Sequence, residues 1–158
     1  MASQTTKTVI KPLLAIALLS QAFADGYDRE DFYFQSYKPN TSIGFYTNKS
    51  CDFINIDHVV SLKDAYDSGA ASWSTYKKRT FANDKANHVP SCGRVNSSKG
   101  SAGPKGFLRR SNDGKGLEYA IVRFCDYLQR YYAVKVEYGL SFDTNDSATF
   151  EQCGVSIG

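Results

Sequence analysis

The chain has 158 residues, of which 42% are apolar and 14% aromatic, and its formal charge at pH 7 is +3. This length suits one domain and argues against two, and the aromatic residues are sufficient for a buried core. The small positive charge by itself selects no class of partner.

Residues 1–24 have the pattern of a secretory signal peptide. Lys7 and Lys11 precede an apolar run at 12–19, and Ala22-Phe23-Ala24 is an A-x-A cleavage site. The run is shorter than the roughly 20 residues of a membrane span, although an uncleaved anchor is the alternative. We therefore expect a mature domain, 25–158, that is secreted or periplasmic and free of the membrane. Loss of the two lysines leaves a charge of +1.

Four cysteines follow the predicted cleavage site: Cys51, Cys92, Cys125 and Cys153. An even number in an exported chain indicates disulfides, and four cysteines allow three pairings. A zinc site is the competing interpretation. The chain has no C-x-x-C pair and its spacings are wide, which disfavours zinc.

The first half of the mature chain predicts a wrapping segment, a strand and two helices. Residues 25–50 are polar and aromatic, with a possible helical turn at 28–31, and show no evident chemistry. Residues 51–60 favour a strand that ends near His58. A helix should begin at Ser61 and stop at Ser68-Gly69. A second should span Trp73–Asn83, with Trp73, Tyr76 and Phe81 on its buried side.

The second half predicts a strand, a short helix and one long helix. Residues 87–92 suit a strand with Val89 pointing inward, and 95–100 suit one or two helical turns. Gly100, Gly103 and Pro104 prevent a longer helix, and Phe107 should anchor the following segment in the core. Residues 111–116 form a polar loop. An apolar stripe predicts a long helix over 117–132, and 134–138 suits a strand.

Basic residues are concentrated between Lys77 and Arg110, where Asp84 is the only acid. Clustered lysines and arginines are suited to the phosphates of a polyanion. A solvated basic surface is the alternative. As candidate substrate contacts we select Lys77, Lys78, Arg79, Arg94 and Lys99.

The adjacent Asp57 and His58 are the strongest candidates for chemistry. A phosphodiester resists hydrolysis, so a catalyst needs a base for water and a cation beside the leaving oxygen. His58 suits the first task. Asp57 and Asn96 offer oxygen ligands for Mg²⁺, which usually takes few protein ligands plus water and phosphate. On a regular strand, Asp57 and His58 point to opposite faces, and such a pair alone is more often structural.

The order of these motifs resembles the HNH nucleases, also called ββα-metal or His-Me finger endonucleases. The branch of secreted bacterial nucleases and GmrSD C-terminal domains is most similar. The resemblance covers about 55–108. The residues that carry it are Asp57-His58-Val59-Val60, Asp67-Ser68-Gly69-Ala70, Trp73, Phe81-Ala82-Asn83-Asp84, Asn87, Asn96-Ser97-Ser98-Lys99-Gly100, Pro104 and Phe107-Leu108.

The resemblance implies a role for each matching residue. His58 corresponds to the general base, and Asp57 and Asn96 to the metal ligands. Asn87 corresponds to a catalytic-site asparagine that braces the loop carrying the base, and Lys99 to a basic position of less settled role. The chain departs from the pattern at Ser61, where the family often has proline. It departs also at His88, where the family often has an apolar residue. We interpret His88 as a structural strand residue; a substrate contact and a spare ligand are the alternatives.

The resemblance also implies an α+β fold, with a ββα-metal core at about 51–110, surrounding helices and a disulfide-tied C-terminal tail. If 52–59 and 88–92 pair antiparallel, Cys51 and Cys92 come together. Cys125 is then left to bond with Cys153.

These expectations describe a secreted, Mg²⁺-dependent endonuclease that cuts DNA or RNA with little sequence preference; Mn²⁺ or another divalent ion is an alternative cofactor. We expect a monomer. The alternatives are an exported nucleic-acid-binding or toxin-like effector protein and a non-catalytic, disulfide-stapled module. Asn96-Ser97-Ser98 also fits the N-glycosylation pattern, and a glycan there would block a predicted ligand.

Overall fold

Two short antiparallel strands carry the residues of interest in the computed structural model, which describes residues 26–115 and 117–158. The strands are β1 (Ile54–His58) and β2 (His88–Cys92). Their register places Ile54 opposite Cys92 and His58 opposite His88. The strands predicted at 51–60 and 87–92 are confirmed. The predicted signal peptide lies outside the described residues.

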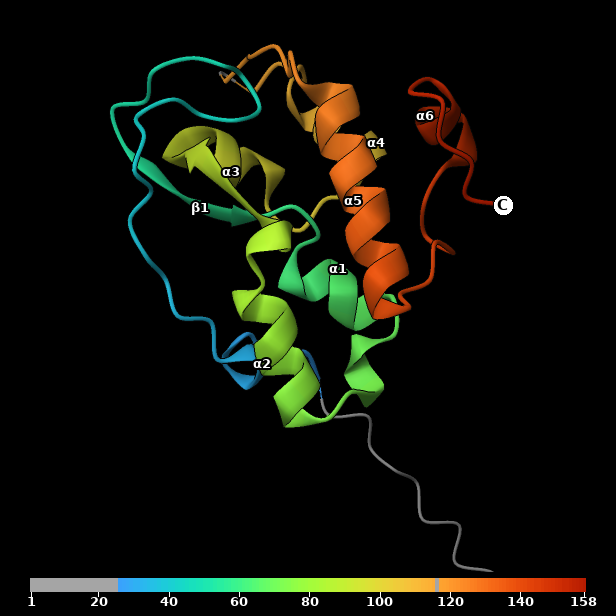
Figure 1. The fold of residues 1–158 in the computed structure, drawn as a ribbon. Coiled ribbons are helices and arrows are strands. Elements are labelled where there is room, and N and C mark those ends of the chain that lie inside the picture. Colours follow the sequence, from blue (N-terminus) through green and yellow to red (C-terminus); the bar gives the residue numbers. More distant parts are fainter. Residues whose placement is uncertain (1–25, 116) are drawn as a thin grey trace, which may run out of the picture.

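Helices connect the strands and follow them (Figure 1). The segment before β1 has one 3₁₀ turn, η1 (Glu30–Phe32), and runs past α2 toward the strands. The connection between the strands contains α1 (Leu62–Asp67), η2 (Ala70–Ser72), α2 (Thr75–Asn83) and η3 (Lys85–Asn87). After β2 come α3 (Gly93–Lys99), α4 (Pro104–Arg110), α5 (Phe124–Tyr138) and α6 (Ser147–Glu151). The result is a mixed α+β fold with a small sheet.

Serine caps define where α1 and α2 begin. The hydroxyl of Ser61 accepts a hydrogen bond from the backbone N–H of Asp64, and that of Ser74 accepts one from Lys77. Such caps satisfy N–H groups that the first helical turn leaves unpaired. The predicted start of the first helix at Ser61 is therefore confirmed.

The prediction for the long helix was wrong at both ends. The helix is Phe124–Tyr138, so the strand predicted at 134–138 is its last turn. Val134 and Lys135 continue the buried face, and Gly139 closes the helix in the left-handed conformation, with φ of 66°. Residues 117–123 are irregular, and two of their N–H groups donate outside the predicted helix: that of Tyr119 to the carbonyl of Ser111 and that of Arg123 to the carbonyl of Tyr46.

The predicted burial of Tyr76 was also wrong, since its side chain is 81% exposed. It lies five residues before the buried Phe81, which places it about 140° away around the helix. Trp73 and Phe81 do pack together, with ring centroids 5.5 Å apart, and Phe81 meets Tyr138 of α5 at 5.0 Å.

Aromatic side chains form most of the core. Tyr46, Phe107 and Tyr127 meet edge to face, with centroids 4.9–5.6 Å apart. Tyr131 continues this cluster along α5 and donates a hydrogen bond to Asp64 of α1. The buried ammonium of Lys135 lies 3.4 Å from the same carboxylate. The core therefore includes a satisfied polar network between α1 and α5.

Both disulfides have the pairing that the resemblance implied. Cys51–Cys92 joins the segment before β1 to the last residue of β2, and Cys125–Cys153 joins α5 to the C-terminal tail. The first bond therefore closes the open end of the strand pair. Within 26–115 and 117–158, no helix has the length and apolarity needed to cross a membrane.

We predict that replacing Cys51 and Cys92 by alanine lowers the free energy of unfolding by about 3 kcal/mol, because the bond closes a long loop in the unfolded chain. Urea denaturation under oxidising conditions measures this. The Cys125→Ala/Cys153→Ala variant is the comparison, because its bond closes a loop of 28 residues against 41 and its removal should lower the free energy of unfolding by a similar amount. An undiminished unfolding free energy in the first variant would contradict the prediction.

Candidate functional site

His58 ends β1 with its ring buried, at 4% exposure. Its Nε2 lies 2.8 Å from the carbonyl oxygen of Ala82 at the end of α2. A carbonyl only accepts hydrogen bonds, so Nε2 carries the proton and Nδ1 of the neutral ring has a free lone pair. Among the described residues, none forms a hydrogen bond with Nδ1. The ring is therefore held in the tautomer whose Nδ1 can accept a proton.

Burial lowers the pKa of His58 from its ordinary value of 6.5 to about 3. The nearby His88 and the cations Arg29 and Lys99 act in the same direction, and the bond to Ala82 partly opposes them. The imidazole is consequently neutral throughout the physiological range.

His88 faces His58 across the strand pair, with ring centroids 4.8 Å apart. Its Nε2 lies 2.9 Å from the same Ala82 carbonyl, and its Nδ1 lies 3.2 Å from the hydroxyl of Tyr37. By the same reasoning Nε2 donates, so Tyr37 donates to Nδ1. Both nitrogens of His88 are thus occupied. Burial also lowers the pKa of His88.

The segment before β1 covers both histidines, although its sequence shows no evident chemistry. The ring of Phe34 meets His58 edge-on at 4.5 Å and His88 at 5.4 Å. Tyr37 bonds to His88. Only the high aromatic content of this segment hinted at such contacts, because they join residues more than 20 positions apart.

Asp57 faces α3, on the other side of β1 from His58. Its Oδ2 accepts a hydrogen bond from the hydroxyl of the buried Tyr46 and lies 3.0 Å from Nζ of Lys99. The ammonium also donates to the backbone carbonyl of His58, at 2.9 Å. The side chain of Lys99 is fully buried. Lys99 therefore links α3 to the end of β1 and does not reach the surface, where a substrate phosphate would lie.

Asn87 braces the turn that follows β1. Its Oδ1 accepts a hydrogen bond from the N–H of Val60 at 2.8 Å, and its Nδ2 donates to the carbonyl of Val60 at 3.1 Å. Its own carbonyl accepts from the N–H of Val59 at 2.8 Å. These three bonds lie directly after His58 and fix the backbone on which the histidine is carried.

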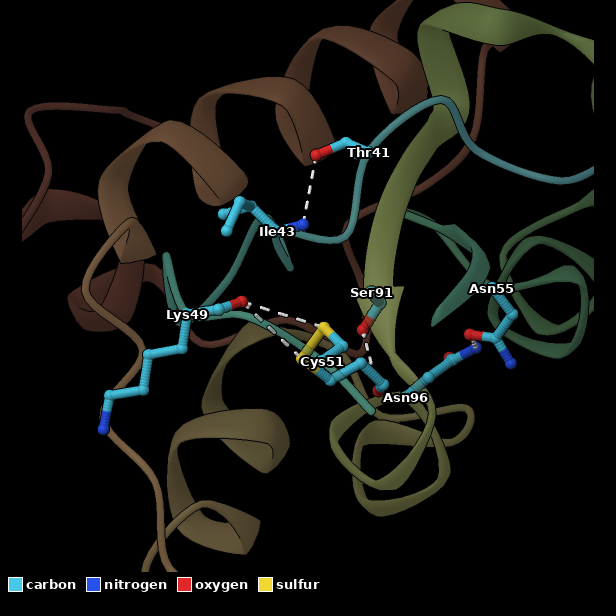
Figure 2. The surroundings of a disulfide bond; sticks show 8 residues. Thr41, Ile43, Lys49, Cys51, Asn55, Ser91 and Asn96 are labelled. Carbon is cyan, nitrogen blue, oxygen red and sulfur yellow. Dashed lines mark hydrogen bonds between the residues drawn. A yellow bond between two sulfur atoms is a disulfide. The ribbon is translucent and has the colours of Figure 1, made fainter. Parts of the chain in front are cut away.

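Asn96 lies beside Asn55, and Figure 2 shows the two amides facing one another next to the disulfide. Nδ2 of Asn96 donates to Oδ1 of Asn55 at 2.9 Å. Asn55 and Asp57 share one face of β1, while Asn96 and Lys99 are one turn apart on α3. The structure thus forms two pairs, Asn55–Asn96 and Asp57–Lys99, and no hydrogen bond among the described residues joins Asp57 to Asn96.

These oxygen donors fit a hard divalent cation in type. Oδ1 of Asp57 and Oδ1 of Asn96 have no hydrogen bond to another described residue. Mg²⁺ accepts one carboxylate and one amide together with waters. The ammonium of Lys99, which is paired with Oδ2 of Asp57, repels a cation bound at the same carboxylate and so limits the affinity for Mg²⁺. Within the described part of the chain, no group of three or more His, Cys, Asp or Glu residues could hold a metal.

The basic residues selected from the sequence occupy different surfaces. Lys77 lies 4.3 Å from the Trp73 ring centroid and donates to the carbonyl of Tyr138. Lys78 lies 3.6 Å from Asp31. Arg79 is on the exposed face of α2, whereas Arg94 lines a groove beside α3. The structure therefore brings only Arg94 and the buried Lys99 near the strand pair.

Comparison with known families agrees with a nuclease relationship. The model of the GmrSD restriction endonuclease C-terminal domain matches residues 9–150. The chain therefore belongs to this family, which confirms that part of the resemblance seen in the sequence. No solved structure matches the chain.

A secreted relative agrees with the expected location. An "Uncharacterized secreted protein" of Arthroderma benhamiae is 36% identical over 90 residues, which is 56% of this chain. The match spans 40% of that relative's length. Disulfides persist in oxidising compartments outside the cytosol. This relative and the two disulfides together confirm the prediction of a secreted or periplasmic protein.

We predict that the metal-free protein loses stability as the pH falls below 6.5. The folded-state pKa of His58 is about 3, so between these values the unfolded chain binds the proton and the folded chain does not. Each buried neutral histidine lowers the free energy of unfolding by about 1.4 kcal/mol for every pH unit by which the pH falls within this range. Urea denaturation in EDTA between pH 7 and pH 5 measures this. The free energy of unfolding of His58→Gln should depend less steeply on pH than that of the wild type. Identical slopes for the variant and the wild type would refute the buried neutral ring.

We predict that Lys99→Met lowers the free energy of unfolding by about 3–5 kcal/mol, because it leaves the buried Asp57 carboxylate unpaired. Adding Asp57→Asn should restore much of the loss. The exposed pair Lys63–Asp67 provides the control, since Lys63→Met should cost less than about 1 kcal/mol. Additive effects of the Lys99 and Asp57 changes in denaturation curves would contradict a coupled pair.

Proposed function

We propose that this protein is an exported, metal-dependent endonuclease of the HNH type, which hydrolyses phosphodiester bonds of DNA or RNA with little sequence preference. Residues 1–24 would be its signal peptide and 25–158 its single catalytic domain. The observation that carries this proposal is the tautomer of His58, whose Nδ1 is free, beside Asp57 in a chain of the restriction-endonuclease family. The order β1, β2, α3 supports the assignment to a ββα-metal core.

His58 is the proposed general base. Ala82 holds the proton on Nε2, so Nδ1 takes the proton from the attacking water. A pKa of about 3 makes the free ring a weak base. The negative charge of a bound phosphodiester favours the protonated ring and therefore raises this pKa when substrate is present.

Asp57 and Asn96 are the proposed ligands of Mg²⁺, through the oxygens that other described residues leave free. When bound, the ion would neutralise charge that develops on the leaving oxygen. Lys99 acts as a positioning residue, because it holds both the Asp57 carboxylate and the carbonyl of His58. Asn87 acts likewise through the backbone of Val59 and Val60.

A nucleic-acid-binding or effector protein that does not itself hydrolyse its ligand is the second candidate. Two observations favour it: Phe34 covers the His58 ring, and Lys99 already pairs with Asp57. Cleavage requires that substrate reach Nδ1, so this alternative predicts binding with no metal-dependent product.

We predict that the wild type cuts plasmid DNA or RNA with Mg²⁺ and not with EDTA, and that His58→Ala lowers the rate by about 10²–10⁴-fold, the usual contribution of a general base. His88→Ala is the matched control. It removes a similarly buried ring from the same carbonyl, and should lower the rate far less, because both nitrogens of His88 are occupied. Undiminished cleavage by a folded His58→Ala variant would sink the mechanism. Asn96→Ala should require higher Mg²⁺ concentrations.

A further inference from the structure

A groove of about 990 Å³ runs along α3 and α4 beside the strand pair. We call it the basic groove, since the side chains that line it include Arg94, Arg109, Arg110 and Lys115. Two carboxylates, Asp52 and Asp113, also line it, so the cations outnumber the anions. A groove of this charge attracts a polyanion.

Two of these cations are free to bind a ligand. Arg94 and Arg109 are exposed, and their guanidinium groups form no ion pair or hydrogen bond with another described residue. Arg110 is engaged, because its guanidinium donates to the backbone carbonyl of Lys99 at 2.7 Å. Lys115 lies 3.9 Å from Asp113. The positive charge available to a ligand is therefore concentrated on Arg94 and Arg109.

A second groove meets the basic groove at Phe53. We call it the asparagine groove, because Asn55 and Asn96 line it, together with Phe34. Phe53 and Asn55 line both grooves. The path from the arginines therefore passes Phe53 and reaches the proposed ligand Asn96 and the ring that covers His58.

Phe53 is exposed at this junction, and its ring packs against Gly93. Its side chain is 67% exposed. A Cβ atom on Gly93 would lie 2.5 Å from Cδ1 of Phe53, so the absence of a side chain at Gly93 lets the ring lie against the backbone. The N–H of Gly93 donates to the carbonyl of Phe53 at 2.9 Å, and the Cys51–Cys92 bond lies next to both residues. An exposed aromatic ring that packs on a glycine at one side and leaves the rest of its surface open is suited to stacking against a ligand.

We propose that the two grooves hold an unpaired nucleic-acid strand, with one base stacked on Phe53 and phosphates bound by Arg94 and Arg109. Aromatic platforms between basic side chains bind single strands without reading their sequence. In a duplex the base faces are already stacked on one another, so Phe53 has no face to contact. This inference rests on the proposed function and defines its substrate as single-stranded.

Fluorescence anisotropy with a labelled oligothymidylate, in EDTA so that no cleavage occurs, tests the role of Phe53. Phe53→Ala should weaken binding about tenfold, the effect of losing one stacked base. Phe53→Leu keeps apolar bulk without an aromatic face and should weaken it similarly. Tyr76→Ala, which removes an exposed aromatic from α2, is the matched control and should bind as the wild type does.

The salt dependence of binding tests the arginines separately. Each phosphate contact on a single strand contributes about 0.7 to the slope of log affinity against log salt. Arg94→Ala/Arg109→Ala should therefore lower the slope by about 1.4, whereas Phe53→Ala should leave it unchanged. Arg130→Ala on α5, whose guanidinium lies over Phe45, is the control with an unaltered slope.

Three results would overturn the inference: unchanged oligothymidylate affinity in both Phe53 variants, tighter binding of a duplex of equal length, or equally effective competition by polyglutamate. These outcomes are distinct from failure of the proposed function. If the wild type binds the oligonucleotide through Phe53 but never cuts it, the proposed endonuclease activity is wrong and the single-strand binding site is confirmed. If the wild type cuts and Phe53→Ala changes neither the cleavage rate nor the affinity, the endonuclease proposal stands and the binding site at Phe53 is wrong.

Discussion

The ion pair between Lys99 and Asp57 is the interaction on which the site depends. Burying both charges is costly, and the cost is offset only because each has further partners: Tyr46 for the carboxylate and the His58 carbonyl for the ammonium. The pair links α3, β1 and the segment before β1. A second buried ammonium, Lys135, joins α5 to Asp64 of α1 in the same way. Two internal charges thus hold helices whose own lengths are too short to be stable alone.

The two histidines show how position creates a chemical difference between identical side chains. Both rings donate to the carbonyl of Ala82 and both are buried. Tyr37 occupies the remaining nitrogen of His88, whereas no described residue occupies that of His58. The bracing of Val59 and Val60 by Asn87 holds the backbone after His58. The unoccupied nitrogen therefore has a defined direction, which a general base requires.

The two ends of the strand pair differ in how they are covered by the rest of the chain. At one end Phe34 covers the buried ring of His58, while the Cys51–Cys92 end borders both grooves and exposes Phe53. The free arginines lie at the open end. The basic and aromatic side chains of the two grooves thus lie beside Asn55 and Asn96, whereas Asp57 and His58 are buried and line neither groove.

The sequence by itself determined the features that depend on local pattern: β-favouring residues of both strands, the serine cap of α1 and the order of the motifs. Sequence pattern was insufficient for α5. The N–H groups of Tyr119 and Arg123 donate outside the predicted helix, to Ser111 and Tyr46, and the β-branched Val134 and Val136 lie in a helix that ends at Gly139. Only the tertiary structure decided that Lys99 is buried on Asp57, that Phe34 covers His58 and that Asn96 pairs with Asn55. These contacts join residues 24–42 positions apart, and their energies depend on burial, which sequence spacing does not specify.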